Sequence, residues 1–358
     1  MSGMPAAPDD AADPADLPAA PHPEPPGVSV FLTVRNEERD LAEAMGRILD
    51  QDYPGPFEVV LAVGPSRDNT AEIAEKLAAE EPRLKVVDNP AGWTPAGLNA
   101  AIRGARHDYL VRVDGHSHIA ADYVSRVVGV LRSTGAANVG GIMVPEGRTA
   151  FEQAVATAMS SPLGIGSAPF HTGGEAGPAA SVYLGAFRRD ALEAVGLYDE
   201  TFLRAQDWEL NYRLRQAGHT VWFDPSLRVG YRPRGSWKQL ATQFFRSGRW
   251  RNHVMRQYPD TASVRYLAPP AAVCAIAAGL AAGIAGAVLA ALGGAGAAAA
   301  PWLLAGLVVP GGYVLGVVVG SLREGRGLPA RSRLLLPPVL ATMHMSWGAG
   351  FLRGPEAR

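Results

Sequence analysis

The sequence predicts an α/β domain with a mainly parallel sheet, followed by helices that cross a membrane. Strands alternate with helices from residue 28 to residue 113, which is typical of a parallel sheet with helices on both faces. No charged residue occurs from Tyr266 to Leu322, and about 20 apolar residues are enough for one membrane helix. With 358 residues, the chain can hold one large domain or two smaller ones.

The strands are short runs rich in apolar and β-branched residues. They are expected at 28–34, 58–63, 84–87, 109–113 and 138–144. The helices are predicted from apolar residues three and four positions apart, near 41–49, 71–79, 98–105 and 151–160. The loops that leave the carboxyl ends of parallel strands meet at one edge of the sheet, where α/β proteins bind ligands.

Composition narrows the class of protein. The formal net charge of −1 gives no reason to expect a nucleic-acid partner. Cys274 is the single cysteine, so an intrachain disulfide and a cysteine-based zinc site are excluded. Residues 1–26 contain eight prolines, five acids and no lysine or arginine, which predicts a disordered tail and excludes a secretory signal. We therefore expect the following domain in the cytosol.

A carboxylate and an imidazole follow the strand at 109–113. Asp114 and His116 can turn toward one cation, because Gly115 lets the backbone bend between them. This ligand pair suits a divalent metal of the kind that bridges diphosphates. The alternative is a strand that runs into an ordinary Asp-Gly turn.

A second group of polar residues lies at 206–215. The run reads as the start of a helix, with Leu210 and Leu214 on the buried side. Asp207 near this start is stabilised by the helix dipole. In the alternative reading, Asp207 only caps the helix and Glu209 is solvated. Upstream, residues 161–180 form a Gly-, Pro- and Ala-rich stretch that is expected to be flexible.

A basic run, Arg246-Ser247-Gly248-Arg249-Trp250-Arg251, is the third candidate site. Its guanidinium groups could hold a diphosphate, because their geometry matches phosphate oxygens. The same run could lie on anionic lipid as an interfacial helix, aided by Trp237, Phe244 and Phe245.

Taken in order, these motifs resemble the family 2 glycosyltransferases of the GT-A fold. The shared features are a strand ending in Asn-Glu, a Ser-x-Asp-x-Thr loop, a segment from Gly92 to Asn99 and a strand ending in Asp-x-His. The likeness covers about residues 28–255. It is greatest to the subgroup typified by succinoglycan-biosynthesis glucosyltransferases, in which Asp-Ala-His replaces Asp-x-Asp.

The resemblance implies a role for each matching residue. Asp207 corresponds to the catalytic base of inverting enzymes, and Asp114 with His116 corresponds to the Mg²⁺ or Mn²⁺ site. The implied nucleotide-binding residues are Thr33, Arg35, Asn36, Glu37, Asp68 and Asn99. The implied diphosphate and acceptor residues are Arg249, Trp250, Gln206, Trp208 and Gly185.

The chain also departs from the family pattern. Val63, Gly64 and Pro65 stand where many members carry an acid for the nucleotide base, and Thr33 replaces a frequent proline. A UDP-sugar is the favoured donor, with other nucleotides left open. Arg246 stands where processive synthases have glutamine, so processivity is not implied.

The expected domains are a tail at 1–26, a GT-A domain at 27–255, a basic juxtamembrane segment at 256–265 and a membrane domain at 266–358. Membrane spans are predicted at 268–292 and 302–322, and the run at 334–352 either spans or lies in the interface. Arginines precede the first predicted span and follow the second, and arginine near a span marks its cytosolic end. We therefore expect a multi-pass plasma-membrane protein whose catalytic domain lies in the cytosol.

The predicted function is the transfer of a sugar, with inversion, from a nucleotide-diphosphate sugar to a glycan acceptor that is lipid-linked. Two other classes of protein could share parts of this pattern: an oxidoreductase and a non-catalytic membrane scaffold. A Rossmann oxidoreductase would need Gly-x-Gly-x-x-Gly after its first strand, and no glycine follows Val34 there. A membrane-anchored scaffold without catalysis stays open as the alternative.

Overall fold

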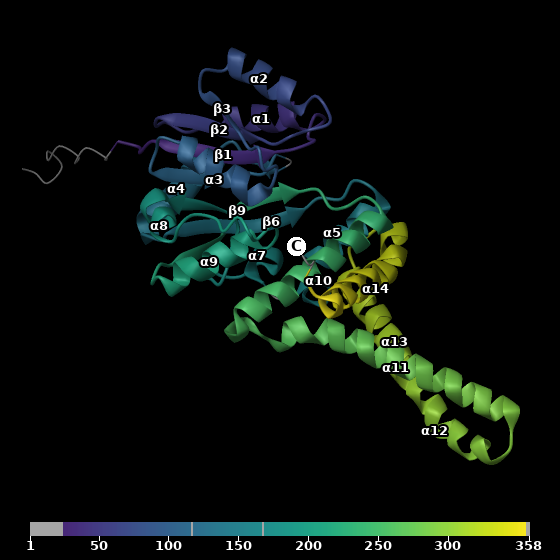
Figure 1. Ribbon diagram of the computed structural model, residues 1–358. Helices are drawn as coiled ribbons and strands as arrows, with labels where there is room; N and C mark the ends of the chain where they lie inside the picture. The colour runs from purple at the N-terminus through teal and green to yellow at the C-terminus, as the bar shows by residue number, and fades with distance from the viewer. Residues whose placement is uncertain (1–23, 116, 167, 356–358) are drawn as a thin grey trace, which may run out of the picture.

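The computed structural model describes residues 24–115, 117–166 and 168–355. The predicted tail at 1–26 therefore lies almost entirely outside the described residues. One mixed sheet forms the centre of the molecule (Figure 1). Its strands are β1 (Val28–Val34), β2 (Phe57–Val63), β3 (Leu84–Asp88), β4 (Tyr109–Arg112), β5 (His118–Ile119), β6 (Asn138–Pro145), β7 (Gly177–Pro178), β8 (Tyr183–Arg188) and β9 (Val221–Tyr231).

The sheet has the order β3-β2-β1-β4-β8-β6-β9-β5, with β7 paired to β9. The first four strands in this order run parallel, as the alternating pattern predicts. Beyond β4, the strand β8 is antiparallel, and β6 and β9 are parallel to each other. Because β1 and β4 are neighbours, the loops after Val34 and Arg112 open at the same edge of the sheet.

The helices of the globular body are α1 (Leu41–Leu49), α2 (Thr70–Glu80), α3 (Thr94–Gly104), α4 (Tyr123–Thr134), α5 (Ala150–Met159), α6 (Pro162–Ile165), α7 (Pro169–Thr172), α8 (Arg189–Ala194), α9 (Gln206–Gln216) and α10 (Trp237–Gln257). Successive side chains of β1 point to opposite faces of the sheet, and both faces are apolar. Val30 and Leu32 pack with α1 and α4, whereas Phe31 packs with α3 and α9. The segment 161–180, expected to be flexible, contains the one-turn helices α6 and α7 and the strand β7.

A long helix, α14 (Ala330–Arg353), closes the body. It packs against α5 and α10, and Leu336, Leu340 and Met343 are fully buried there. Gly248 of α10 lies directly against the backbone of Trp347, so the two helices approach closely. The run at 334–352 therefore lies in a helix that packs against the body through one face. Its placement as a span or an interfacial segment stays a prediction.

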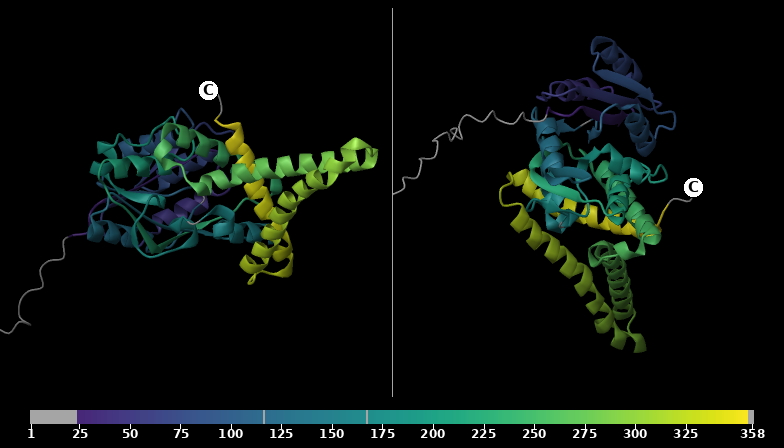
Figure 2. Two further views of the ribbon diagram at one scale, coloured as in Figure 1. Left: turned by 90° about the horizontal axis from the view of Figure 1, so that it is seen from below. Right: turned by 90° about the vertical axis from the view of Figure 1, so that its left-hand side faces the viewer.

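Between α10 and α14 the chain forms a helical hairpin that projects from the body (Figure 2). It consists of α11 (Val264–Leu292), α12 (Ala300–Leu304) and α13 (Val308–Glu324), with short 3-10 turns around α12. Val264–Leu292 and Ala297–Glu324 are long and apolar enough to cross a membrane, with mean hydropathies of 2.3 and 2.1. Only 17% and 6% of their most apolar windows are buried, so these are not core helices of a soluble domain.

Small residues let the arms of the hairpin approach. A Cβ added at Gly279 would come within 2.5 Å of the Gly306 carbonyl oxygen, and one at Gly286 would meet the backbone of Leu304 at 2.9 Å. Close packing through glycine is typical of membrane helices. The fold is thus an α/β domain on a mixed sheet, with two helices apolar and long enough to cross a membrane inserted before its last helix.

Candidate active site

A buried arginine brings two carboxylates together at the edge of the sheet. Arg112, the last residue of β4, is 4% exposed in its side chain. Its Nη2 donates a hydrogen bond to Asp114 Oδ1 at 3.0 Å, and its Nη1 donates to Asp207 Oδ1. Asp207 is the second residue of α9, on the other side of this edge. The predicted metal ligand and the predicted base therefore share one guanidinium group.

The electrostatics of this group follow from its burial. Burial raises the pKa of the Asp207 carboxyl, Arg112 opposes this rise, and Asp114 adds to it. Burial would lower the pKa of Arg112, but Asp207 and Asp114 hold it well above its ordinary value. A carboxyl whose pKa lies above its usual range is better matched to accepting a proton near neutral pH.

Of the two predicted metal ligands, Asp114 is the one that the structure describes, and its side chain could bind a metal ion. Its side chain is 27% exposed and offers hard carboxylate oxygens. A Cβ added at Gly115 would come within 2.8 Å of Val34, so the turn after Asp114 is held close to β1. His116 lies outside the described residues. Among the residues described, no cluster of three acidic, histidine or cysteine side chains occurs. One carboxylate with open positions suits Mg²⁺ or Mn²⁺, which take further ligands from water and substrate phosphates.

The loops after β1 and β2 are joined by the residues predicted to bind a nucleotide. The backbone N–H of Arg67 donates to Asn36 Oδ1 at 2.8 Å, and the N–H of Glu37 donates to Thr70 Oγ1 at 2.8 Å. Asp68 accepts from the backbone N–H of Thr70 at 3.2 Å, so it also supports the start of α2. These contacts place Asn36, Glu37 and Asp68 together at the ligand-binding edge.

Arg35, in the loop after β1, contacts the loops that follow β2 and β3. Its Nε donates to the Pro65 carbonyl oxygen at 3.0 Å, and its Nη1 donates to that of Gly92 at 3.3 Å. Thr33 points into the sheet, where its hydroxyl donates to the Ala62 carbonyl oxygen at 3.0 Å.

Asn99 is only 2% exposed. Its amide nitrogen donates to the Tyr198 carbonyl oxygen at 2.9 Å, and its amide oxygen accepts from the N–H of Tyr198 at 3.0 Å. This side chain therefore fixes the segment that precedes α9. Nucleotide binding by Thr33 and Asn99 stays a prediction, and their internal hydrogen bonds do not favour it.

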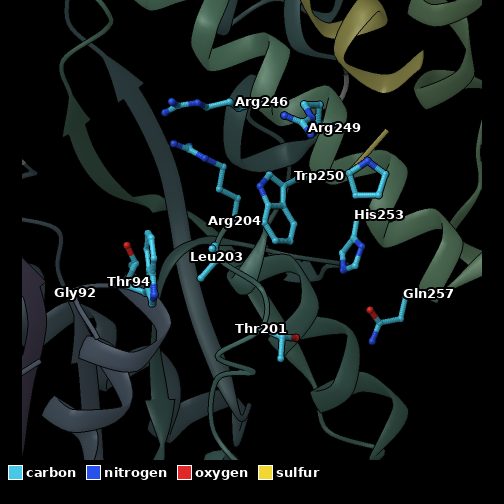
Figure 3. Close-up of a pocket in the computed structure, with 12 residues that line it drawn as sticks. Gly92, Thr94, Thr201, Leu203, Arg204, Arg246, Arg249, Trp250, His253 and Gln257 are labelled. Atoms are coloured by element: carbon cyan, nitrogen blue, oxygen red, sulfur yellow. The ribbon is translucent and has the colours of Figure 1, made fainter. Parts of the chain in front are cut away.

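A cavity of about 710 Å³ lies between α10 and the segments around Thr94 and Leu203 (Figure 3). The arginines in its wall are Arg204, Arg246 and Arg249, so the cavity is strongly basic. Trp250 also lines it, with its ring 5.2 Å from the His253 ring and 6.2 Å from that of Phe202. The sequence-predicted residues Arg249 and Trp250 are thus brought to one cavity, on α10.

Arg246 belongs to the basic run predicted to hold a diphosphate, whereas Arg204 and His253 were not predicted from the sequence. The signal for His253 was its spacing on a helix, since residues 246, 249, 250 and 253 share one face. Arg204 had no such signal, because it lies in the irregular segment before α9. Burial and the neighbouring Arg246 lower the pKa of Arg204, which is typical of a cation placed among other cations.

Three predicted acceptor residues lie outside the cavity wall. Trp208 stacks on Tyr212 with ring centroids 5.5 Å apart. Gly185 faces the interior of the sheet, where an added Cβ would come within 2.6 Å of Asn138, so its positive φ of 115° serves packing. Gln206 is the first residue of α9 and does not line the cavity. Substrate contacts of all three stay predictions.

Glu209 has a structural role. It is fully buried, accepts hydrogen bonds from Arg213 at 2.6 and 2.7 Å, and accepts another from the Tyr258 hydroxyl at 3.1 Å. The alternative reading, in which Glu209 is solvated, is wrong, because Arg213 and Tyr258 enclose it. This leaves Asp207 as the acid of α9 that borders the ligand edge.

Comparisons with known proteins agree with this architecture. The model of the family "Glycosyl transferase family 2" matches residues 29–196. The succinoglycan biosynthesis protein ExoA of Rhizobium meliloti (strain 1021) is 34% identical over 330 residues, covering 90% of this chain and 93% of that protein. This chain belongs to glycosyl transferase family 2.

Another relative comes from Methanococcus voltae. It is a dolichyl N-acetyl-alpha-D-glucosaminyl phosphate 3-beta-D-2,3-diacetamido-2,3-dideoxy-beta-D-glucuronosyltransferase, 23% identical over 64% of this chain and 74% of its own length. Among solved structures, the mannosyltransferase PcManGT from Pyrobaculum calidifontis, in complex with GDP-Man and Mn²⁺, has a TM-score of 0.55 at 20% identity. That match covers 95% of this chain and 90% of the mannosyltransferase, and it supports the GT-A fold.

Proposed function

We propose that this family 2 glycosyltransferase moves a sugar, with inversion, from a nucleotide-diphosphate sugar to a lipid-linked glycan on the cytosolic face of the plasma membrane. The observation that carries the proposal is the Arg112 bridge between Asp114 and Asp207. The bridge brings the proposed metal ligand and the proposed base, whose pKa is raised, to one guanidinium group. The three arginines of the larger cavity supply a cationic surface for the diphosphate.

In this proposal Asp207 takes the proton from the acceptor hydroxyl as that oxygen attacks the anomeric carbon. Arg112 holds Oδ1, so Oδ2 is the oxygen positioned for the proton. A single displacement inverts the anomeric centre, and no covalent sugar–enzyme intermediate is required. Arg246, Arg249 and Arg204 would hold the departing diphosphate, whose oxygens match guanidinium forks.

Asp114 and His116 would hold the Mg²⁺ or Mn²⁺, which acts as a Lewis acid on the diphosphate when it is bound. The mannosyltransferase neighbour was solved with GDP-Man and Mn²⁺, which supports a divalent metal and a nucleotide-sugar donor for this chain. A UDP-sugar remains the favoured donor.

A lipid-linked acceptor is supported by the membrane hairpin and by the relatives. The Methanococcus voltae enzyme is named for a dolichyl phosphate-linked sugar, and another relative, from Synechocystis sp. (strain ATCC 27184 / PCC 6803 / Kazusa), is a beta-monoglucosyldiacylglycerol synthase. The topology is supported by the contact between α10 and α14, because the hairpin leaves and rejoins the body on one side. Arg323, Arg326, Arg331 and Arg333 follow the second arm, which favours the cytosol for that side.

The test uses the full-length protein in lipid nanodiscs with a panel of UDP-, GDP- and dTDP-sugars. Release of the nucleoside diphosphate is measured with Mn²⁺ and after chelation, and the anomeric configuration of any product is read by NMR. Metal-dependent release with inversion supports the proposal. A protein that binds and turns over no nucleotide-sugar would be the non-catalytic scaffold instead.

A further inference from the structure

A second cavity lies where the membrane hairpin joins the body. Its volume is about 440 Å³, within the range of roughly 300–1,000 Å³ usual for small-molecule sites. Residues from α6, α10, α11, α13 and α14 line it. Its walls are mostly apolar, for example Leu163, Phe244, Ala272, Met343 and Trp347. We call this cavity the junction groove.

One edge of the junction groove is cationic. Arg265, at the start of α11, lines the groove, and its guanidinium carbon is 4.6 Å from the centre of the Tyr266 ring. Arg251 of α10 lies 4.0 Å from the same ring. Within the described ranges of the chain, no carboxylate forms an ion pair with either arginine. Two close positive charges without a counter-charge favour an anionic ligand.

Arg251 is partly buried and Arg265 is exposed, so we expect the two arginines to act differently on a ligand. Arg251 Nη1 is buried and makes no hydrogen bond to a described residue. Burial lowers the pKa of Arg251, and the positive charge of Arg265 lowers it further. Arg265 is exposed, so it is the group that can contact a ligand, while Arg251 strengthens the positive potential behind it.

Helix α10 connects the junction groove to the active-site cavity. Phe244 and Ser247 line the groove, whereas Arg246 and Trp250 line the active-site cavity on the neighbouring face of the same helix. A ligand with an apolar tail, an anionic group and a polar head could therefore reach both cavities around one helix. The groove also opens at the root of the two membrane helices, where a lipid tail is available.

We propose that the junction groove binds the apolar tail of the lipid-linked acceptor and that Arg265 binds its phosphate. The choice of this occupant rests on the proposed function, which requires an acceptor carried on a lipid. The apolar walls match the tail, and the uncompensated charge of Arg265 and Arg251 matches the phosphate.

The experiment measures binding of a long-chain polyprenyl phosphate to the full-length protein in nanodiscs. Ala272→Trp should fill the groove and weaken binding about ten-fold, which corresponds to excluding roughly two methylene groups from an apolar site. The matched control is Ala271→Trp, at an exposed neighbouring position of α11 that does not line the groove. Arg265→Gln should also weaken binding, whereas Arg256→Gln, an exposed arginine outside the groove, should not.

A binding constant unchanged by both Ala272→Trp and Arg265→Gln overturns the proposal. Equal competition by phosphatidylglycerol overturns the chosen occupant, because the groove would then hold bulk membrane lipid. Binding is read without a donor sugar, so the result is separate from catalysis. If Ala272→Trp abolishes binding but no nucleotide-sugar is turned over, the groove assignment stands and the proposed function fails.

Discussion

Arg112 and Asp207 are 95 positions apart in the sequence and form a hydrogen-bonded ion pair at the edge of the sheet. The arginine comes from β4 and the aspartate from α9, so the pair fixes the helix against the strand. The same guanidinium also binds Asp114, so it holds the predicted base Asp207 at a fixed distance from the predicted metal ligand. If Asp207 is the base, the geometry of proton transfer depends on the buried Arg112 side chain.

Replacing Asp207 by asparagine should stop the chemistry and spare binding. Asparagine keeps the size of the side chain but cannot take a proton, so we expect turnover to fall by about two to four orders of magnitude. Affinity for the nucleotide-sugar, measured by calorimetry, should stay near that of the unaltered protein. Normal turnover by this variant would show that the base is another residue.

Replacing Arg112 by lysine should lower turnover more than affinity. Lysine keeps the positive charge but cannot bind Asp114 and Asp207 with two separate N–H groups in a fixed plane. Loss of one charge-assisted hydrogen bond is worth roughly 1.5–3 kcal/mol, so kcat should fall about ten- to a hundred-fold. Steady-state kinetics checks this, and an equal change in kcat and in the donor Kd would contradict a positioning role.

Replacing Asp114 by alanine should abolish metal-dependent turnover. The change deletes the described hard oxygen ligand at the site, so neither Mg²⁺ nor Mn²⁺ should restore activity. The measurement is nucleoside diphosphate release over a titration of each metal. Full activity of the unaltered protein in EDTA would argue against the metal assignment.

Glu58 should make the stability of the body depend on pH. Burial would raise the pKa of this carboxyl, but hydrogen bonds from Ser29 and Arg106 outweigh burial and lower it. A folded-state pKa below the unfolded value, about 4.3, contributes stability that is present above that value and is lost as the pH falls through the folded pKa. Glu58→Gln should therefore cost about 1–3 kcal/mol of unfolding free energy near neutral pH and less below about pH 4.

Thermal unfolding at both pH values measures this effect. The control is Glu43→Gln on the surface of α1, where an exposed ion pair with Arg47 contributes little. A pH dependence that is the same in Glu58→Gln and in the unaltered protein would refute the assignment.

Replacing Gly248 by alanine should loosen the contact between α10 and α14. The added Cβ would meet the Trp347 carbonyl oxygen and come within 2.9 Å of the Phe351 nitrogen. Overpacking of this kind costs about 1–3 kcal/mol, so the midpoint of thermal unfolding should fall. Gly311→Ala is the control, because an added Cβ there meets nothing within 4 Å. Similar midpoints for the two variants would contradict the packing argument.

The parts of the site that follow a local sequence pattern could be predicted. Asp114 and Asp207 were predicted as site residues because each follows or begins a regular element in the order typical of the family, and the structure brings both to Arg112. Their roles stay predictions. Arg112 was not assigned a role, although a charged residue inside the apolar run Tyr109–Val113 is itself a signal. Its two partners depend on tertiary structure, and no local pattern contains them.

The membrane region shows the same limit. Composition correctly predicted two apolar helices, and the glycines of α11 do pack against the second arm. Composition could not separate α14 from a membrane span, because a helix buried in a protein core is as apolar as one buried in lipid. Its position is decided by contacts with α5 and α10, which lie far away in sequence.

The position of α14 has a practical consequence for anyone who wishes to make a water-soluble fragment. Because α14 follows the hairpin in sequence but belongs to the body, a fragment ended at Arg265 would lose it and expose the apolar sides of α5 and α10. Such a fragment should aggregate even though it contains every predicted catalytic residue. Excising only the hairpin, and joining the end of α10 to the start of α14 with a short polar linker, would keep the body's last core helix in place.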